Sequence, residues 1–291
     1  MRQLDFSGRV AVVTGAGRGL GREYAELLAR RGAALVLNDL PGAADADAVD
    51  RVRDSIVAEG GQATVVHASV CDPDGARAII DAALRAHGRV DILVNNAGGG
   101  AACDFASSTH DQFHDTLASH VFGTVAVTKS AWPHMCDAGY GRIVNTVSGA
   151  AYGMAGFTAY ATAKSAMLGF TRSLALEAPA DVRVNAVSPL AATRLMAVSG
   201  TFNDDQLKVN QEWLPTALVA PVVAFLAHQE CTLNGEILWA GGGTVRRWVM
   251  GEAGEYADRQ LTPEAVRANL DRIMDPSNFT LVRSASIRLS R

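Results

Sequence analysis

This sequence has few cysteines, no excess of basic charge and no long apolar run. Its 291 residues hold four cysteines and no C-x-x-C pair, and its histidines show no metal-ligand spacing. Neither a metal site nor a disulfide framework is predicted, and a reducing compartment is favoured. The formal net charge is −4, whereas phosphate-binding surfaces need clustered basic residues. We therefore expect no nucleic-acid partner.

Membrane and targeting segments are not evident either. The longest apolar stretch, residues 214–227, contains two prolines and is too short to span a bilayer. The first residues include Asp5 and no apolar segment of the kind that secretion signals carry. The last three residues, Leu-Ser-Arg, match neither S-K-L nor K-D-E-L. We expect a cytoplasmic protein without membrane contact.

Short β-branched runs alternate along the chain with longer stretches of helical periodicity. The pattern predicts strands at residues 9–14, 34–37, 63–67, 91–95, 142–146 and 182–187. It predicts helices at 19–31, 46–59, 73–87 and 158–177, and two more between 109 and 138. Because parallel strands need crossover connections, this order predicts an α/β fold with one doubly wound parallel sheet, Rossmann-like, and helices on both faces. We predict a single domain over 1–249, with 250–291 as its C-terminal extension, helical within 250–274.

A glycine-rich turn follows the first predicted strand, in the sequence TGAGRGLG at residues 14–21. The spacing T-G-x-x-x-G-x-G allows a tight turn, close backbone approach to a pyrophosphate and close helix–strand packing. The helix that follows directs free N–H groups toward an anion. Such turns are common alone, but a position between strand and helix predicts a dinucleotide site. Its predicted contacts are Gly15, Arg18, Gly19, Leu20 and Gly21.

Asp39 ends the second predicted strand, 18 residues after Gly21. A carboxylate there can accept hydrogen bonds from the adenosine ribose and would repel a 2′-phosphate, so it favours NAD over NADP. Arg18 is an opposing signal, since a cation in the turn can pair with that phosphate. We give Asp39 more weight, because a carboxylate repels the phosphate whatever Arg18 does. An ordinary strand-end role for Asp39 stays open.

Tyr160 and Lys164 are four residues apart on one predicted helix and so share a face. A lysine ammonium and a positive nicotinamide ring would lower the tyrosine pKa and let the phenol move a proton near neutral pH. Ser148 follows the fifth predicted strand and can hydrogen-bond the same substrate oxygen. Tyr-x-x-x-Lys alone arises often by chance. It becomes specific together with Ser148, the glycine turn and the Asn-Asn-Ala-Gly segment at 95–98.

With these motifs in place, the sequence resembles the short-chain dehydrogenase/reductase family. The resemblance rests on residues 14–21, the segment 95–98, Ser148 and the YATAK stretch at 160–164. It implies that Tyr160 is the acid/base, that Lys164 binds the nicotinamide ribose and that Ser148 orients the substrate oxygen. The implied cofactor contacts outside the glycine turn are Asp39, Val70, Asn96, Ala97, Gly98, Tyr160, Lys164, Pro189 and Thr193.

The sequence departs from the family pattern at several positions. The fourth catalytic position, an asparagine in N-x-x-G, falls on His120, and the interval from Ser148 to Tyr160, 160 − 148 = 12, is one residue short. Leu190 stands where a glycine is usual, and Gly241 replaces an aspartate. His120 is a catalytic candidate because imidazole can donate and accept in a proton relay behind Lys164. The alternative, a packed histidine without a role in turnover, stays open.

At these positions the sequence resembles the (3R)-hydroxyacyl-CoA dehydrogenase parts of peroxisomal multifunctional β-oxidation enzymes. Those enzymes also have H-x-x-G and an N-D-L strand end. The resemblance implies an NAD-dependent enzyme that interconverts a secondary alcohol and a ketone, with a 3-hydroxyacyl-CoA as substrate. A hydroxysteroid is the alternative substrate, and a non-catalytic dinucleotide-binding regulator is the alternative of another class. The resemblance also implies a homodimer or homotetramer. The segment 195–213 resembles a substrate flap, in which Leu195, Met196, Val198 and Phe202 could cover an acyl chain or a steroid. The alternative, that these residues only cover the core, stays open.

Overall fold

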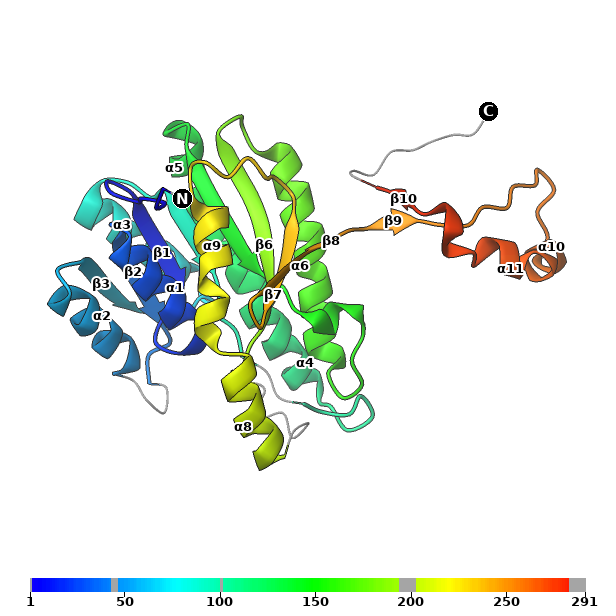
Figure 1. Ribbon diagram of the computed structural model, residues 1–291, viewed down its shortest axis with the longest axis horizontal. Helices are drawn as coiled ribbons and strands as arrows, with labels where there is room; N and C mark the ends of the chain where they lie inside the picture. The colour runs from blue at the N-terminus through cyan, green and yellow to red at the C-terminus, as the bar shows by residue number, and fades with distance from the viewer. Residues whose placement is uncertain (1, 43–46, 100–101, 194–202, 283–291) are drawn as a thin grey trace. The chain divides into compact units, whose positions relative to one another are not determined.

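The computed structural model describes residues 2–42, 47–99, 102–193 and 203–282 (Figure 1). They form two compact units, which divide between Arg246 and Arg247. The predicted boundary after residue 249, and the assignment of 250–291 to the same domain, remain predictions. The hydrophobic residues of the flap expected at 195–213 fall on 194–202, outside the described residues.

The larger unit is built on an eight-stranded sheet of order β3-β2-β1-β4-β5-β6-β7-β8. Its strands are β1 (Val10–Thr14), β2 (Ala34–Asp39), β3 (Gln62–His67), β4 (Ile92–Asn95), β5 (Gly141–Thr146), β6 (Val182–Leu190), β7 (Ile237–Gly241) and β8 (Thr244–Trp248). Neighbouring strands from β3 through β7 run parallel. Helices lie on both faces of the sheet (Figure 1). The predicted doubly wound α/β fold is therefore confirmed.

The helices of this unit connect successive strands. They are α1 (Gly19–Arg30), α2 (Ala48–Ala58), α3 (Pro73–His87), α4 (His110–Leu117), α5 (Gly123–Asp137), α6 (Thr158–Glu177), α8 (Asp204–Trp213) and α9 (Ala220–Ala227). A π-helical turn, Ala118–Phe122, joins α4 to α5. The sequence predicted α3 and α6 with these bounds, whereas α8, α9, β7 and β8 were not predicted.

Two apolar cores cover the two faces of the sheet. One packs α1, α2 and α9 against residues such as Val13, Leu35 and Val144. The other packs α3, α5 and α6 against Val12, Leu93 and Ile143. Because neighbouring strand residues point into opposite cores, the central strands are apolar throughout rather than alternating. Packing on both faces fixes the central strands, and so it also positions the loops at their carboxyl ends.

The strand order reverses between β1 and β4. The chain moves from β1 outward to β3 and then returns to pair β4 with β1. In open α/β sheets the loops that leave such a switch point diverge and form a crevice at the carboxyl ends of the strands. The predicted glycine turn leaves β1 and the predicted Asn-Asn-Ala-Gly segment leaves β4, so the fold brings both to this crevice.

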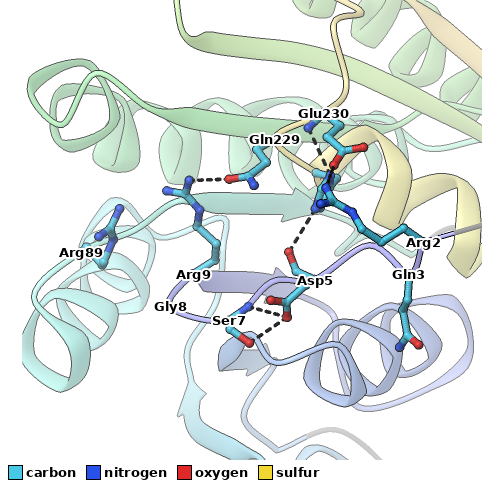
Figure 2. Close-up of a pocket in the computed structure, with 10 residues that line it drawn as sticks. Arg2, Gln3, Asp5, Ser7, Gly8, Arg9, Arg89, Gln229 and Glu230 are labelled. Carbon is cyan, nitrogen blue, oxygen red and sulfur yellow. Dashed lines mark hydrogen bonds and ion pairs between the residues drawn. The ribbon is translucent and has the colours of Figure 1, made fainter.

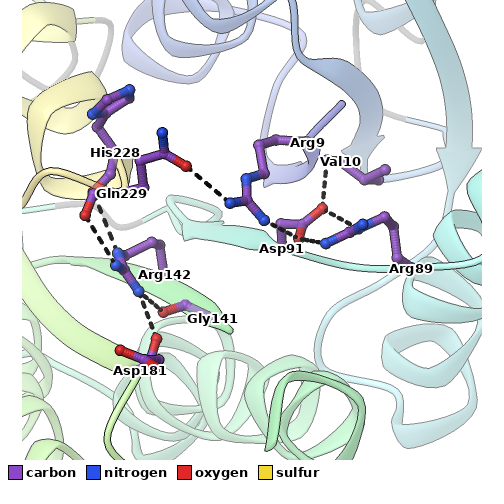
Figure 3. Close-up of polar contacts among 9 residues, drawn as sticks. All are labelled: Arg9, Val10, Arg89, Asp91, Gly141, Arg142, Asp181, His228 and Gln229. Atoms are coloured by element: carbon purple, nitrogen blue, oxygen red, sulfur yellow. Dashed lines mark hydrogen bonds and ion pairs between the residues drawn. The ribbon is translucent and has the colours of Figure 1, made fainter. Parts of the chain in front are cut away.

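A buried carboxylate ties together the opposite, amino-terminal edge of the sheet (Figure 3). Asp91 is 1% exposed and accepts hydrogen bonds from the Val10 amide (2.9 Å), Arg9 (3.2 Å) and Arg89 (2.8 and 2.6 Å). The guanidinium of Arg142, also buried, donates to four main-chain carbonyls nearby. These contacts hold the starts of β1, β4 and β5 in register.

The smaller unit, from Arg247 onward, contains the antiparallel pair β9 (Gly251–Glu252) and β10 (Thr280–Leu281). Two short helices lie between them in sequence, α10 (Pro263–Ala268) and α11 (Leu270–Ile273). The prediction of a helix within 250–274 is thus only partly correct, because a strand occupies 251–252. Across both units, no helix in the described ranges is long and apolar enough to cross a membrane.

Candidate active site

The glycine turn between β1 and α1 is packed too tightly for side chains. Gly15 has a φ of +64°, and a Cβ there would lie 2.9 Å from the Cα of Ala97. A Cβ on Gly21 would collide with the Gly15 carbonyl oxygen and lie 2.6 Å from the side-chain nitrogen, Nδ2, of Asn96. A Cβ on Gly19, by contrast, would meet no other described atom within 4 Å. The turn is therefore closed toward the protein and open at the start of α1.

Thr14 and Asn96 bind the glycine turn to the segment after β4. The Thr14 hydroxyl accepts hydrogen bonds from the amides of Asn96 and Ala97, both at 3.0 Å. The Asn96 side chain donates to the carbonyls of Thr14 and Gly15, also at 3.0 Å. The two predicted cofactor-binding segments are thus held side by side across the switch point.

Asp39 lies at the end of β2 and reaches the same turn. One carboxylate oxygen accepts a hydrogen bond from the Gly17 amide at 2.9 Å, and the other accepts from the Leu40 amide at 2.8 Å. Asp39 is half-buried. The carboxylate therefore sits directly beside the predicted pyrophosphate-binding turn, as a ribose-binding acid must.

Ser148 and Tyr160 meet at the carboxyl ends of the central strands. Ser148 follows β5 and caps a short 3-10 helix, Gly149–Tyr152, by accepting a hydrogen bond from the Ala150 amide at 3.3 Å. Tyr160 lies in the first turn of α6. Burial raises the pKa of Tyr160, and a hydrogen bond with Ser148 lowers it by less. The serine hydroxyl and the phenol can therefore contact one substrate oxygen.

Lys164 lies one helical turn after Tyr160, with its side chain inside the protein. It is 3% exposed, and its Nζ donates a 2.8 Å hydrogen bond to the carbonyl of Thr146. The Nζ is 5.6 Å from the centroid of the Tyr160 ring. Burial lowers the pKa of Lys164 to about 7. The Thr146 carbonyl therefore fixes an amine whose charge changes near neutral pH beside the phenol.

His120 approaches the same phenol from the π-helical turn Ala118–Phe122. Its ring packs edge-on against the Tyr160 ring with 5.2 Å between centroids, and it is 4% exposed. Its Nε2 is 2.9 Å from the Gly99 carbonyl, while its buried Nδ1 has no hydrogen-bond partner among the residues that the structure describes. Burial, and secondarily the charge of Lys164, hold the pKa of His120 well below its usual value. The histidine is thus a neutral ring with one unused nitrogen at the site.

The remaining predicted cofactor residues lie around this crevice. A Cβ on Gly98 would collide with the His120 ring, so the glycine permits that close approach. Val70, after β3, is buried and packs against Gly123. Pro189 lies near the end of β6 in register with Ala240 of β7. The others are Arg18, which precedes α1, Leu20, which is half-buried within α1, and Thr193, which is half-buried after β6.

Two pockets stand out in the described structure. One, of about 390 Å³, lies between α4 and α6 and has Tyr160 in its wall. The other, of about 610 Å³, is polar and is lined by residues that precede β1 and β4, including Arg9 and Arg89, and by residues 228–230 after α9 (Figure 2). Figure 2 shows its Arg2 paired with Glu230. The larger pocket therefore lies at the amino-terminal edge of the sheet, away from Tyr160, and the smaller one adjoins the candidate active site.

Comparison with known proteins identifies the family. Residues 9–201 match the short chain dehydrogenase family. This range contains β1 to β6, with the loops that form the crevice, but not β7 and β8. The chain belongs to this family. As a short-chain dehydrogenase, it is an oxidoreductase that acts on CH–OH groups.

Several relatives of this short-chain dehydrogenase are similar over most of its length. It is 39% identical over 277 residues to a short-chain type dehydrogenase/reductase of Mycobacterium tuberculosis, covering 92% of this chain and 95% of that protein. It is 40% identical over 248 residues to peroxisomal multifunctional enzyme type 2 of Drosophila melanogaster, covering 83% of this chain and 40% of that enzyme. It is 32% identical over 248 residues to a subunit of (2S)-[(R)-hydroxy(phenyl)methyl]succinyl-CoA dehydrogenase of Thauera aromatica, covering 82% and 98%. The chain thus spans less than half of the multifunctional relative.

Solved structures show the same likeness. The full-length multifunctional enzyme type 2 of Drosophila melanogaster superposes with a TM-score of 0.80 at 31% identity, over 97% of this chain and 48% of that one. A 7α-hydroxysteroid dehydrogenase in complex with NADH and 7-oxo glycochenodeoxycholic acid superposes with a TM-score of 0.74 at 30% identity, over 84% and 98%. The family and the neighbour solved with NADH suggest a nicotinamide dinucleotide as cofactor.

The short-chain dehydrogenase provides a cradle that fits such a cofactor. Gly15 and Gly21 leave no room for side chains against the crevice wall, while Gly19 is open above the start of α1. The free amides of the first turn of α1 and the Asp39 carboxylate would contact a pyrophosphate and a ribose, respectively. Lys164 and Tyr160 would hold the nicotinamide end.

Sequence reasoning missed three supporting residues. Thr14 organises two amides after β4, the Thr146 carbonyl holds Lys164, and the Gly17 amide holds Asp39. A hydroxyl at the end of a strand, directly before a glycine turn, was a usable signal for Thr14. The other two act through main-chain atoms, so no side-chain pattern could have revealed them.

Proposed function

We propose that this chain catalyses the reversible, NAD-linked oxidation of a 3-hydroxyacyl-CoA to the 3-oxoacyl-CoA. The observation that carries the proposal is the cluster of Ser148, Tyr160 and Lys164 beside a pocket at the carboxyl ends of the strands. A non-catalytic regulator would need the glycine turn but not this acid/base cluster. The CoA-ester substrate is supported by the name of the Thauera aromatica relative and by the likeness to the multifunctional enzyme.

In this mechanism Ser148 donates a hydrogen bond to the substrate oxygen, and Tyr160 takes the proton from the substrate hydroxyl as the C–O bond becomes a carbonyl. A bound nicotinamide dinucleotide supplies the acceptor for the hydride on the carbinol carbon. Lys164 in its charged form favours the phenolate, because an ammonium nearby stabilises the negative oxygen. Holding the reacting groups at contact distance supplies much of the rate enhancement.

His120 acts in this proposal as a positioning residue. Its ring packs against the Tyr160 phenol and its Nε2 anchors the Gly99 carbonyl. Its unpartnered Nδ1 gives a neutral acceptor that can bind a water of the proton relay. Ordinary core packing would give the same ring contact. The alternative is therefore a histidine without a role in turnover, and mutation of His120 decides between the two.

NAD rather than NADP is supported by Asp39. Its carboxylate accepts a hydrogen bond from the Gly17 amide, and its negative charge beside the glycine turn would repel the 2′-phosphate of an NADP bound there. The NADH named with the 7α-hydroxysteroid dehydrogenase is consistent with the same choice.

The substrate and cofactor are tested together by kinetics on the purified full chain. A panel of 3-hydroxyacyl-CoAs and hydroxysteroids is offered with NAD or NADP, and reduction of the coenzyme is followed by absorbance. We expect turnover of 3-hydroxyacyl-CoAs with NAD. Turnover of hydroxysteroids alone would replace the proposed substrate by the alternative, which the likeness to the 7α-hydroxysteroid dehydrogenase favours. Tight coenzyme binding without turnover of any alcohol would favour the regulator.

We also propose a homodimer or homotetramer and a cytoplasmic location. The first rests on the family resemblance and is tested by the mass of the protein in solution. For the second, a peroxisomal location is the alternative, because the multifunctional relative is named as peroxisomal. Microscopy of the tagged protein in its own cell decides it.

A further inference from the structure

The pocket beside Tyr160 has a defined wall of its own. It holds about 390 Å³, near the lower end of the roughly 300–1,000 Å³ typical of small-molecule pockets. Its wall includes Gly99, Phe113, Gly156, Phe157, Ala159 and Tyr160. Since Tyr160 contributes to this wall, a part of the substrate that extends from the reacting carbon toward α4 can enter the pocket.

Hydrogen bonds fix the pocket's shape. The Cys103 amide donates to the Gly156 carbonyl at 2.8 Å and so joins the segment before α4 to the segment before α6. The start of α4 is fixed by a capping box, in which Thr109 and Gln112 exchange hydrogen bonds of 2.9 and 3.2 Å. The pocket is therefore largely preformed.

The polarity of the wall distinguishes the two ends of an acyl-CoA. Its described lining contains no lysine or arginine, and its one charged side chain is the carboxylate of Asp115. The phosphates of coenzyme A would find no counterion there and would be repelled by Asp115. Two aromatic rings offer apolar contact instead: Phe157, which packs edge-on at 6.3 Å from the Tyr160 ring, and Phe113 of α4. The wall thus disfavours the phosphates and offers a hydrocarbon chain aromatic contact, beside the polar side chains of Ser108, Gln112, Thr116, Ser119 and Thr158.

Phe113 is the one large apolar side chain that α4 contributes. The other α4 residues in the described lining, Gln112, Asp115 and Thr116, are polar. Phe157, in contrast, is 7% exposed and packs into the core, so its position is fixed by more than the pocket. A change of size at residue 113 therefore changes the space available for a chain with the least effect elsewhere.

We propose that this pocket holds the acyl chain of the substrate and that Phe113 determines the preferred chain length. The proposal rests on the proposed 3-hydroxyacyl-CoA dehydrogenase function. The coenzyme A end of the substrate leaves the reacting carbon in the other direction. A methylene in an apolar enzyme pocket changes kcat/KM by about tenfold or more, so one aromatic ring is enough to shift the preference.

The test compares kcat/KM over a series of 3-hydroxyacyl-CoAs of increasing chain length in the full chain and in three variants. Phe113→Ala should raise kcat/KM for chains longer than the wild-type optimum by about tenfold relative to that optimum, and Phe113→Trp should move the optimum to shorter chains. Phe105→Ala, which removes a 69% exposed ring outside the pocket, should leave the profile unchanged. Melting temperature and NADH binding are measured for each variant, and Phe113→Leu replaces Phe113→Ala if that variant does not fold.

The possible failures are distinct. An unchanged chain-length profile in folded, NADH-binding Phe113 variants would overturn this proposal while leaving the proposed function intact. An equal loss of kcat/KM for every chain length would overturn it as well, since that result indicates a structural role. Absence of turnover of every 3-hydroxyacyl-CoA by the wild-type chain would overturn the proposed function, and this inference with it.

Discussion

The Nζ of Lys164 lies 5.6 Å from the centroid of the Tyr160 ring and donates its hydrogen bond to the Thr146 carbonyl. Burial of both groups disfavours their charged forms, so the pKa of Lys164 falls to about 7 and that of Tyr160 rises. The sequence predicted a lowered Tyr160 pKa from Lys164 and a nicotinamide ring together. Within the chain itself, burial raises the phenol pKa, and the contact that lowers it is the hydrogen bond with Ser148.

Lys164 makes the stability of the fold depend on pH. Its pKa is about 7 in the folded chain against 10.5 as its ordinary value, so between these values the unfolded chain binds the additional proton. The free energy of unfolding should therefore rise as pH increases from about 7 toward 10.5. Urea unfolding of the wild type and of Lys164→Met at several pH values checks this. A rise of the same size in the variant would show that other groups cause it.

Asp39 should control the choice of coenzyme. Replacing it by serine removes the charge that opposes a 2′-phosphate, while Arg18, which follows Gly17 in sequence, remains. We expect Asp39→Ser to shift the ratio of kcat/KM for NADP to that for NAD by at least about tenfold, the equivalent of about 1.4 kcal/mol. Asp74→Ser, at an exposed site on α3, is the matched control. An unchanged ratio would assign Asp39 a strand-end role only.

His120 should affect turnover more than coenzyme affinity. Removing the ring in His120→Ala frees the Gly99 carbonyl and the side of Tyr160 that the ring covers. We expect kcat to fall by about tenfold and its pH profile to move, because a relay residue contributes to proton transfer. His120→Asn, which keeps a donor and an acceptor, should recover most of kcat. An unchanged kcat across pH in His120→Ala would leave the histidine as a packing residue.

Removing the buried carboxylate of Asp91 should destabilise the fold. Asp91→Ala leaves the guanidinium groups of Arg9 and Arg89 without their shared acceptor and the Val10 amide unpaired. Because Arg9 and Arg89 are partly exposed, we expect a loss of about 1–3 kcal/mol in the free energy of unfolding, mainly from the unpaired Val10 amide. Asp74→Ala, whose partner Arg77 is exposed, should cost less than about 1 kcal/mol. Chemical denaturation of both variants measures the difference.

The sheet and its first six strands could be predicted because their signals are local. Alternating apolar runs and helical periods set α3 and α6 to the residue, and Asp39 ends β2 as expected. The strands β7 and β8 were missed because five-residue runs that include Trp239 or Arg246 lack a distinctive period. The short elements of the smaller unit have the same limitation.

The candidate site was less open to prediction. The Tyr160–Lys164 pairing follows from helical spacing, but the grouping with Ser148 and His120 came from resemblance and from the fold. The π-helical turn that brings His120 against Tyr160 has no sequence signal. The pKa shift of His120 depends on its burial, which only packing determines. Main-chain contributions from Gly17 and Thr146 were likewise invisible.

The central claim is that the Tyr160 hydroxyl transfers the proton, and Tyr160→Phe tests it most directly. The change removes one oxygen and keeps the ring that packs against His120 and Phe157. The account predicts that kcat for the best alcohol substrate falls by about 10²–10⁴-fold while the Kd for NADH changes by less than about threefold. A variant that keeps most of the wild-type kcat would contradict the account.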